Sequence, residues 1–267
     1  MEKIDLAILG ATTGEIAPLY SLFRPAGSFK VAGNPFSTYI YRDLKLLIGT
    51  TGVGKVNASA TTASVLSRFR ATEVWNIGCA GAYGDSGLEI GDVLVTLSCI
   101  CGDEGILEKN GPMPTSRLEI PLVLKNGLAF DDSFPLDEFV SRRRIQSLLP
   151  AGGYSLNSSG GIQTCDNECH IEKSHEFRIR YGPSLTVGMV SGDVQTAAER
   201  STRYGALAEN MEGSAVAQTC LLFEAPFLEI RGISNMAGIR DKAKWELTVA
   251  IDRCVAVVRR LLDNLVH

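Results

Sequence analysis

The chain has 267 residues, of which 45% are hydrophobic and 21% charged, and its formal net charge is −4 at pH 7. This balance excludes a disordered or low-complexity chain, and the acidic surplus argues against a general nucleic-acid binder, which needs positive charge to meet phosphates. No apolar run approaches the roughly 18 residues that span a bilayer, and the first residues do not resemble a signal peptide, so we expect a cytoplasmic protein without membrane contact.

The first part of the chain shows short apolar runs that end in glycine-rich turns. The run 4–9 breaks at Gly10, as a buried strand does when it ends in a loop. A small-residue segment at 56–69 has the apolar spacing of a closely packed helix. The expected elements are strands at 4–9, 39–42, 44–48, 74–77 and 92–100, and a helix at 56–69.

Residues 103–163 are less regular, and the remainder of the chain again alternates strands with helices. We expect strands at 184–190 and 227–233, a short strand before Gly161, and helices at 136–149, 195–204, 213–223 and 245–265. This alternation predicts an α/β sandwich. No internal repeat or long linker is visible, so we expect a single domain over residues 1–267.

The seven cysteines are scattered through the chain and predict buried thiols rather than a disulfide framework. One cluster contains Cys165, Cys169 and His170, and His175 is the one nearby candidate for a fourth ligand. A structural zinc site commonly draws its four ligands from two spaced pairs. We therefore interpret the cluster as a polar loop and expect no metal.

Two glycine-rich segments imitate nucleotide-binding motifs. Residues 49–55 match most of a P-loop, but Val56 stands where a Ser or Thr would hold Mg²⁺. Residues 10–14 lack the spacing of the dinucleotide fingerprint. The sequence therefore predicts neither an NTPase nor a nucleotide cofactor. The small-residue loops at 10–14, 78–84 and 191–193 follow predicted strands, and open α/β sheets place their ligand pockets at such ends.

Three polar positions adjoin these loops. Glu15 follows the first loop, Glu212 precedes an apolar helix, and Asn235 comes two residues after the strand-like segment 227–233. A Glu near a helix start often does no more than complement the helix dipole. That structural explanation remains open for each acid taken alone.

Five sequence blocks then occur in a familiar order: 52–58, 78–82, 90–95, 210–213 and 233–235. The chain resembles the purine and uridine phosphorylase superfamily, and within it the hydrolytic branch that includes the methylthioadenosine/adenosylhomocysteine nucleosidases. Segments 209–213 and 229–235 are most similar to the futalosine hydrolases, which cleave hypoxanthine from futalosine in an alternative menaquinone pathway. The resemblance covers about residues 5–105 and 185–250, whereas 106–183 match nothing recognisable.

The resemblance implies a three-layer α/β/α sandwich around a mixed, partly barrel-like sheet. It also implies a purine nucleoside substrate, no cofactor, and a homo-oligomer (dimer or higher). By the same resemblance, Glu15 would be the general base on water, Glu212 would bind the ribose hydroxyls and favour the cationic centre, and Asn235 would bind the N7 edge of the purine. The further substrate-binding residues would be Cys79, Ala80, Gly81, Gln195 and Met211.

Two departures from the adenine-cleaving nucleosidases bear on the substrate. They carry Asp at the position of Asn235 and Glu at the position of Asn210. An amide at 235 favours a 6-oxopurine such as hypoxanthine, because it can donate to N7 without a carboxylate facing O6, although Asn can also pair with adenine.

No Arg follows Gly14, where similar phosphorylases place one for phosphate, and Arg24 lies too far along the chain, so we expect hydrolysis. A methylthioadenosine/adenosylhomocysteine-type nucleosidase, a 6-oxopurine nucleoside phosphorylase and a non-catalytic nucleoside-binding protein remain alternatives. Arg142–Arg144 we interpret as a solvated helix face.

Overall fold

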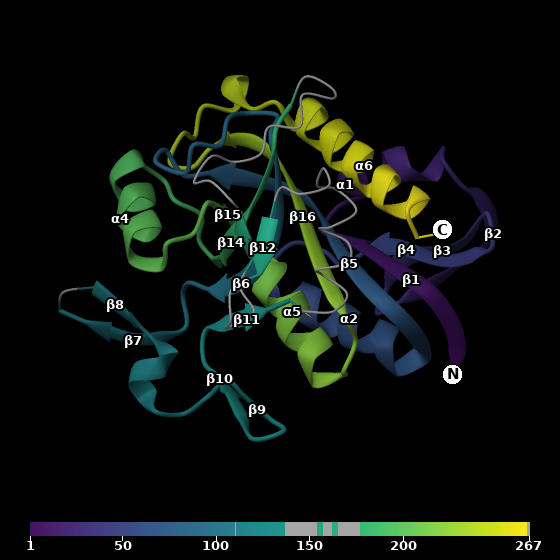
Figure 1. The fold of residues 1–267 in the computed structure, drawn as a ribbon, viewed down its shortest axis with the longest axis horizontal. Coiled ribbons are helices and arrows are strands. Elements are labelled where there is room, and N and C mark those ends of the chain that lie inside the picture. Colours follow the sequence, from purple (N-terminus) through teal and green to yellow (C-terminus); the bar gives the residue numbers. More distant parts are fainter. Residues whose placement is uncertain (110, 137–153, 157–161, 165–176, 266–267) are drawn as a thin grey trace.

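A computed structural model describes residues 1–109, 111–136, 154–156, 162–164 and 177–265 (Figure 1). Most of the helix expected at 136–149, including Arg142–Arg144, lies outside the described residues. The same holds for Cys165, Cys169, His170 and His175. In the described part of the chain, no helix combines the length and the apolar character needed to cross a membrane.

Five strands form a closed ring at the centre of the fold. They are β5 (Phe69–Ala82), β6 (Val93–Cys101), β14 (Ile179–Thr186), β15 (Ala208–Asn210) and β16 (Phe227–Met236). β16 pairs with both β5 and β6, β14 joins β6 to β15, and β15 closes the ring against β5. Three of the five pairs are parallel and two are antiparallel, which confirms the expected mixed, partly barrel-like sheet.

The sheet continues beyond the ring through β1 (Glu2–Gly10), which pairs in parallel with β5 and with β4 (Leu44–Thr50). β3 (Asn34–Tyr41) and β2 (Arg24–Val31) extend it in antiparallel register, so the expected hairpin is confirmed and is followed outward by a strand that the sequence did not predict. The shorter strands are β7 (Gly105–Glu108), β8 (Gly111–Pro114), β9 (Val123–Lys125), β10 (Leu128–Phe130), β11 (Ser133–Pro135), β12 (Tyr154–Leu156) and β13 (Ile162–Thr164). β12 matches the short strand expected before Gly161.

Helices cover the sheet on two sides (Figure 1). α1 (Thr13–Tyr20) and α6 (Leu247–Asp263) pack against each other and against β5, and α6 also lies along β16. α2 (Lys55–Arg68) and α5 (Gly213–Leu222) form the opposite layer. The remaining helical elements among the described residues are α4 (Val194–Tyr204), η1 (Thr115–Leu118) and η2 (Lys242–Lys244). The arrangement confirms the sandwich.

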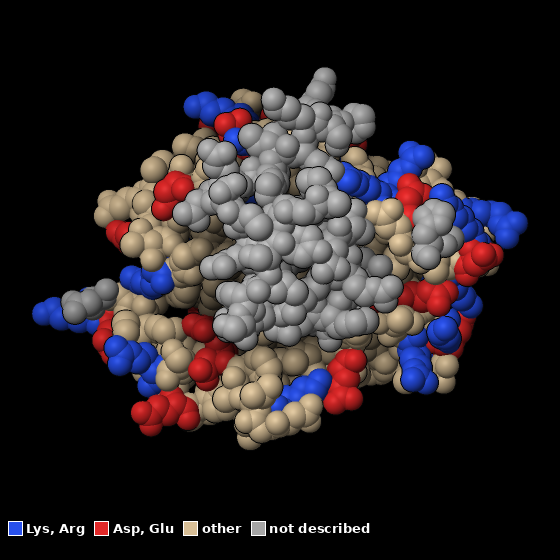
Figure 2. Space-filling view, viewed as in Figure 1, with Lys and Arg blue, Asp and Glu red and all other residues tan. Residues whose placement is uncertain are grey.

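The apolar patterns of the sequence account for this packing. The first two residues of β1, Glu2 and Lys3, are exposed. From Leu6 to Gly10 the strand is buried, as expected for a parallel strand with helices on both faces. α6 buries Ala250, Cys254, Val258 and Leu261, a stripe at helical spacing that faces the sheet. On the described part of the face in Figure 2, acidic and basic side chains are interspersed, as the small net charge suggests.

Candidate active site

A cavity of about 420 Å³ opens where β1, β5, β15 and β16 meet their loops. It draws residues from each of the three small-residue loops predicted to form a pocket: Gly14 from the first, Cys79 from the second and Ser191 from the third. The loops lie far apart in the sequence, and the ring of strands brings them to one place. Glu15, Glu212 and Asn235 all line this cavity, so the structure assembles the three polar positions expected to act together.

Glu15 occupies the first turn of α1, and its carboxylate is held at both oxygens. Oε2 accepts hydrogen bonds from the backbone N–H of Thr12 at 2.9 Å and from its hydroxyl at 3.1 Å, while Oε1 accepts one from the N–H of Cys79 at 3.0 Å. Thr12 and Glu15 form a capping box, which ties the carboxylate to the start of the helix. The side chain is half-buried and therefore fixed in direction while remaining open to the cavity.

Glu212 is buried at the start of α5, where its Oε1 accepts a hydrogen bond from the backbone N–H of Gly54 at 2.9 Å. The P-loop-like turn thus binds a carboxylate of its own chain. Burial raises the pKa of Glu212, and the charges of Glu15 and Glu229 act in the same direction, whereas Arg231 and the Gly54 bond oppose it. The result is a desolvated carboxylate whose charge is felt strongly inside the cavity.

Behind the two acids lies a buried ion pair that the sequence analysis did not single out. Nη2 of Arg231 donates to Oε2 of Glu229 at 2.8 Å, and both side chains are 0% exposed. Burial alone would raise the pKa of Glu229, but the Arg231 charge and several hydrogen bonds outweigh it, so the pKa lies below its ordinary value. Charged residues at alternate positions of the apolar strand 227–233 were the signal that could have revealed the pair.

Every strand of the ring contributes to the polar cluster around this pair. Side chains of β5, β6, β14 and β15 donate to the Glu229 carboxylate. The donors are Asn76 (3.0 Å), Thr96 (3.0 Å), Ser184 (2.6 Å) and, at 3.4 Å, Asn210. The interior of the ring is therefore built to hold one carboxylate, and through it one guanidinium.

Gly78 allows this guanidinium to approach Glu15. A Cβ at position 78 would lie 2.2 Å from Oε1 of Glu15 and 2.8 Å from Nη1 of Arg231, so these two atoms are within about 5 Å of each other. Nη1 and Nε of Arg231 are buried and have no hydrogen-bond partner among the described residues. A buried donor of this kind is costly unless something binds it. An oxygen atom in the gap between Oε1 and Nη1 could hydrogen-bond to both.

The amide of Asn235 is oriented by its neighbours. Its Oδ1 accepts from the hydroxyl of Ser234 at 2.8 Å, and its Nδ2 donates to the carbonyl of Met236 at 3.0 Å. An amide nitrogen carries two hydrogens, so Nδ2 keeps one for a ligand. Asn235 therefore presents a donor to the cavity.

The other predicted binding residues divide into two groups. Cys79, Ala80, Gly81 and Met211 line the cavity. Gln195 does not: it is exposed on α4, and its amide donates to Glu199 at 3.0 Å. Burial raises the pKa of the Cys79 thiol, with a further contribution from Glu15, so this cysteine is a neutral wall residue rather than a nucleophile.

Two further polar residues of the cavity were not predicted to bind substrate. Oδ1 of Asn210 accepts from the backbone N–H groups of Glu212 (3.0 Å) and Gly213 (2.7 Å), which fixes the turn into α5. Glu209 is buried beside it and pairs with Arg200.

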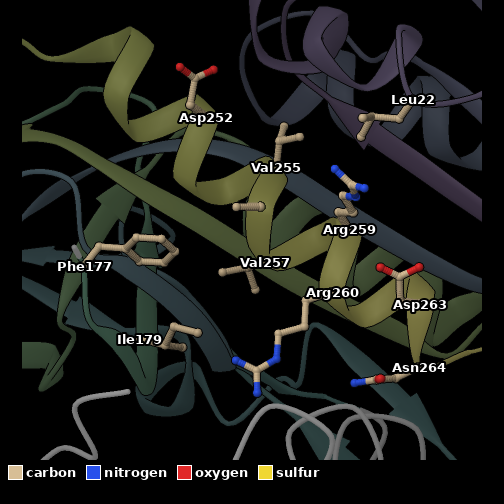
Figure 3. A pocket seen from close by; sticks show the side chains of 11 residues that line it. Leu22, Phe177, Ile179, Asp252, Val255, Val257, Arg259, Arg260, Asp263 and Asn264 are labelled. Atoms are coloured by element: carbon tan, nitrogen blue, oxygen red, sulfur yellow. The ribbon is translucent and has the colours of Figure 1, made fainter. Parts of the chain in front are cut away.

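A larger hollow of about 720 Å³ lies along α6, away from these acids (Figure 3). Its walls are formed largely by α6 and the start of β14, with Phe177, Ile179 and Val257 as apolar members. One of its carboxylates, Asp263, accepts hydrogen bonds from Tyr41 and Arg42. The first cavity, which is lined by Glu15 and Glu212 and has the buried Arg231 guanidinium behind them, is the better candidate for chemistry in spite of its smaller volume.

Comparisons with known proteins show the family and the fold of the chain. A family model described as the Phosphorylase superfamily matches residues 5–266. The chain is 29% identical to a futalosine hydrolase of Thermus thermophilus (86% of this chain, 88% of the relative) and 27% identical to a 5'-methylthioadenosine/S-adenosylhomocysteine nucleosidase of Staphylococcus aureus (90% of each). The native structure of futalosine hydrolase from Helicobacter pylori superimposes with a TM-score of 0.75 at 21% identity, covering 98% of both chains.

Proposed function

This chain belongs to the phosphorylase superfamily, and we propose that it is a nucleosidase that hydrolyses the N-ribosyl bond of a 6-oxopurine nucleoside. The substrate that we favour is futalosine, which would be cleaved to hypoxanthine and dehypoxanthine futalosine in menaquinone biosynthesis. The observation that carries the proposal is the placement of Glu15 and the unpartnered nitrogen of Arg231 on two sides of one gap, with Glu212 in the same cavity.

The attacking water would bind in that gap. Oε1 of Glu15 would accept one proton of the water, and Nη1 of Arg231 would donate to its oxygen, which both orients the water and satisfies the buried guanidinium. As the water attacks the anomeric carbon, its proton passes to Glu15. The bond between that carbon and the purine nitrogen breaks, and the electron pair leaves with the base as its anion. The base then takes up a proton from solvent to become neutral hypoxanthine, and Glu15 returns its proton to solvent.

Glu212 would bind the ribose and stabilise the positive charge that develops on it. Breaking an N-ribosyl bond passes through an oxocarbenium-like centre, and a buried carboxylate stabilises such positive charge more effectively than an exposed one. Because Gly54 holds Oε1, the other oxygen of Glu212 is the one available to accept hydrogen bonds from ribose hydroxyls. Met211, which also lines the cavity, would pack beneath the ring.

The charge of the cavity favours water over phosphate as the nucleophile. Of the described residues that line it, Arg240 is the one Lys or Arg, and its guanidinium lies over the ring of Trp245 at 5.0 Å. Phosphorolysis normally requires bidentate cations around the anion. Glu15, Glu209 and Glu212 would instead repel phosphate.

We therefore expect base release to be independent of phosphate. Purified protein incubated with futalosine in phosphate-free buffer should yield hypoxanthine and the free ribosyl product, and adding phosphate should leave the rate unchanged. Chromatography of both products provides the measurement. Strict dependence on phosphate, with a ribose-1-phosphate derivative as product, would show that the protein is a phosphorylase.

A second candidate function is cleavage of 6-aminopurine nucleosides such as methylthioadenosine, because a relative of similar identity carries that name. Asn235 separates the two candidates. Its free donor suits N7 of either base, but an ionised Asp at this position would face the O6 atom of hypoxanthine unfavourably. We therefore expect the native protein to cleave futalosine well ahead of methylthioadenosine and adenosylhomocysteine.

Replacing Asn235 by Asp should move kcat/KM toward the 6-amino substrate by about one to two orders of magnitude relative to the 6-oxo substrate, which corresponds to about 1.4–2.7 kcal/mol. Competition between futalosine and its 6-amino counterpart measures the ratio directly for both proteins. Equal native rates on the two substrates, and no change in the variant, would show that Asn235 does not determine which purine is cleaved.

A further inference from the structure

The residues that line the cavity differ in exposure between its deep end and its mouth. Glu209 and Glu212 are each 5% exposed and belong to the deep end. Val53 is 51% exposed, Leu247 is 46% exposed and Arg240 is exposed as well, so these three side chains mark the mouth. A nucleoside whose base and ribose fill the buried end would extend its 5′ substituent toward the mouth.

Arg240 brings a positive charge without an ionic partner to this mouth. Its guanidinium carbon lies 5.0 Å from the centroid of the Trp245 ring. No hydrogen bond or salt bridge joins its side chain to another residue in the part of the chain that the structure describes. A cation–π contact uses the charge of a guanidinium but none of its five N–H donors. These donors are therefore available to an anionic ligand.

Trp245 holds this guanidinium in place. Its indole Nε1 donates to the carbonyl of Ile239 at 3.0 Å, and the backbone N–H of Glu246 donates to the carbonyl of Ser234 on β16 at 2.8 Å. The indole, which is half-buried and lines the cavity, is thus fixed between β16 and the start of α6. An arginine that already rests on a fixed ring has less rotamer freedom to lose, which lowers the entropic cost of binding a ligand.

The other charged residues that line the cavity are negative. They are Glu15, Glu209 and Glu212, and they disfavour an anionic substrate unless a cation compensates for them. Arg240 is the residue placed to do so at the entrance. The planar fork of a guanidinium matches the two oxygens of a carboxylate. Val53 and Leu247 supply apolar surface beside it for the carbon atoms that join such a carboxylate to the ribose.

We propose that Arg240 selects nucleosides whose 5′ substituent ends in a carboxylate, which it binds through its N–H groups while Val53 and Leu247 contact the apolar part of that substituent. This inference rests on the proposed function and deepens it, since it assigns a residue to the end of the substrate that lies beyond the ribose. Futalosine, whose 5′ substituent ends in a benzoate, belongs to this class. The methylthio group of methylthioadenosine has no charge for Arg240 to bind.

Hydrolysis of futalosine and of its methyl ester tests the proposal. The two substrates share the base, the ribose and the arene, and differ by one negative charge. We expect the native protein to have the higher kcat/KM on the acid. Arg240→Met, which keeps an apolar stem over Trp245, should lower the ratio of kcat/KM for the acid over the ester by about tenfold or more. The change should lie mainly in KM for the acid, with kcat/KM for the ester within about threefold of native.

Lys242→Met is the matched control. It removes the same charge two residues along the chain, from an exposed position on η2 outside the cavity lining, and should leave the ratio unchanged. Arg240→Lys keeps the charge but not the planar fork, and should lower the ratio less than Arg240→Met does. Because Arg240 is exposed, we expect thermal unfolding to show native stability for all three variants.

The outcomes separate this inference from the proposed function. A native preference for the acid that falls in Arg240→Met and persists in Lys242→Met supports both. Hypoxanthine release from futalosine with a ratio that is unchanged in Arg240→Met, or lowered equally by Lys242→Met, overturns the role of Arg240 and leaves the proposed function standing. A native protein that releases adenine from methylthioadenosine but no hypoxanthine from futalosine or its ester overturns the proposed function, and with it this inference.

Discussion

Replacing Glu15 by Gln should lower kcat by roughly 100-fold or more, with a much smaller change in substrate affinity. The amide keeps the shape of the side chain and can still accept hydrogen bonds from Thr12 or from Cys79, but it cannot take a proton from water. Initial rates of hypoxanthine release at saturating substrate, beside calorimetric titration of free hypoxanthine, separate the two effects.

Glu199→Gln provides the same chemical change outside the cavity, on the exposed surface of α4. We expect it to leave kcat and hypoxanthine affinity unchanged. Unfolding temperatures of both variants show whether either one has lost structure. A Glu15 variant with near-native kcat would show that the carboxylate serves only to cap α1, and the proposed mechanism would then be abandoned.

The second large effect is expected at Glu229. Glu229→Gln removes the one carboxylate that pairs directly with the buried Arg231 guanidinium, and breaking a buried pair from one side typically costs about 3–5 kcal/mol of unfolding free energy. We expect denaturant unfolding to show a loss near the lower end, because Gln preserves some of the hydrogen bonds from Thr96 and Ser184. We also expect kcat to fall roughly 10- to 100-fold, because Arg231 would no longer be held against the water site.

Asn210 offers a way to test whether the negative charge of Glu229, rather than the shape of its side chain, is what this site requires. Its Nδ2 lies 3.4 Å from Oε1 of Glu229. In the double variant Glu229→Gln/Asn210→Glu, the carboxylate is moved from β16 to β15, across the interior of the ring, and part of the lost stability and kcat should return. Asn210→Glu alone, which sets two buried carboxylates against each other, should be destabilising. A double variant no better than Glu229→Gln would mean that shape, not charge, governs this site.

The amino-acid sequence was sufficient to predict most strands of the central sheet and the family to which the chain belongs. Strands such as 4–9 and 227–233 and the helix at 213–223 could be predicted because their apolar spacing is a local property of the chain. The elements that were missed were missed for local reasons as well. α1 was not predicted because it is short and contains Pro18, and β2 because its exposed face leaves little apolar pattern to recognise.

The sequence also singled out Glu15, Glu212 and Asn235, and the structure brings all three to one cavity. It placed Gln195 among the binding residues as well, whereas the structure turns that side chain out to solvent on α4. Which face of a helix meets the cavity depends on how the helix docks, and the sequence blocks carry no information about that.

The buried partners of the acids could be assigned only from the tertiary structure. Glu229 and Arg231 stand two residues apart on β16, a spacing that gives them a common face but does not say whether that face is solvent or core. Closure of the five strands into a ring makes it an interior, and supplies the donors from β5, β6, β14 and β15 that make a buried charge tolerable. The same closure sets Glu209 and Asn235 on either side of Gly81, because register between strands distant in sequence is decided by packing of the whole sheet.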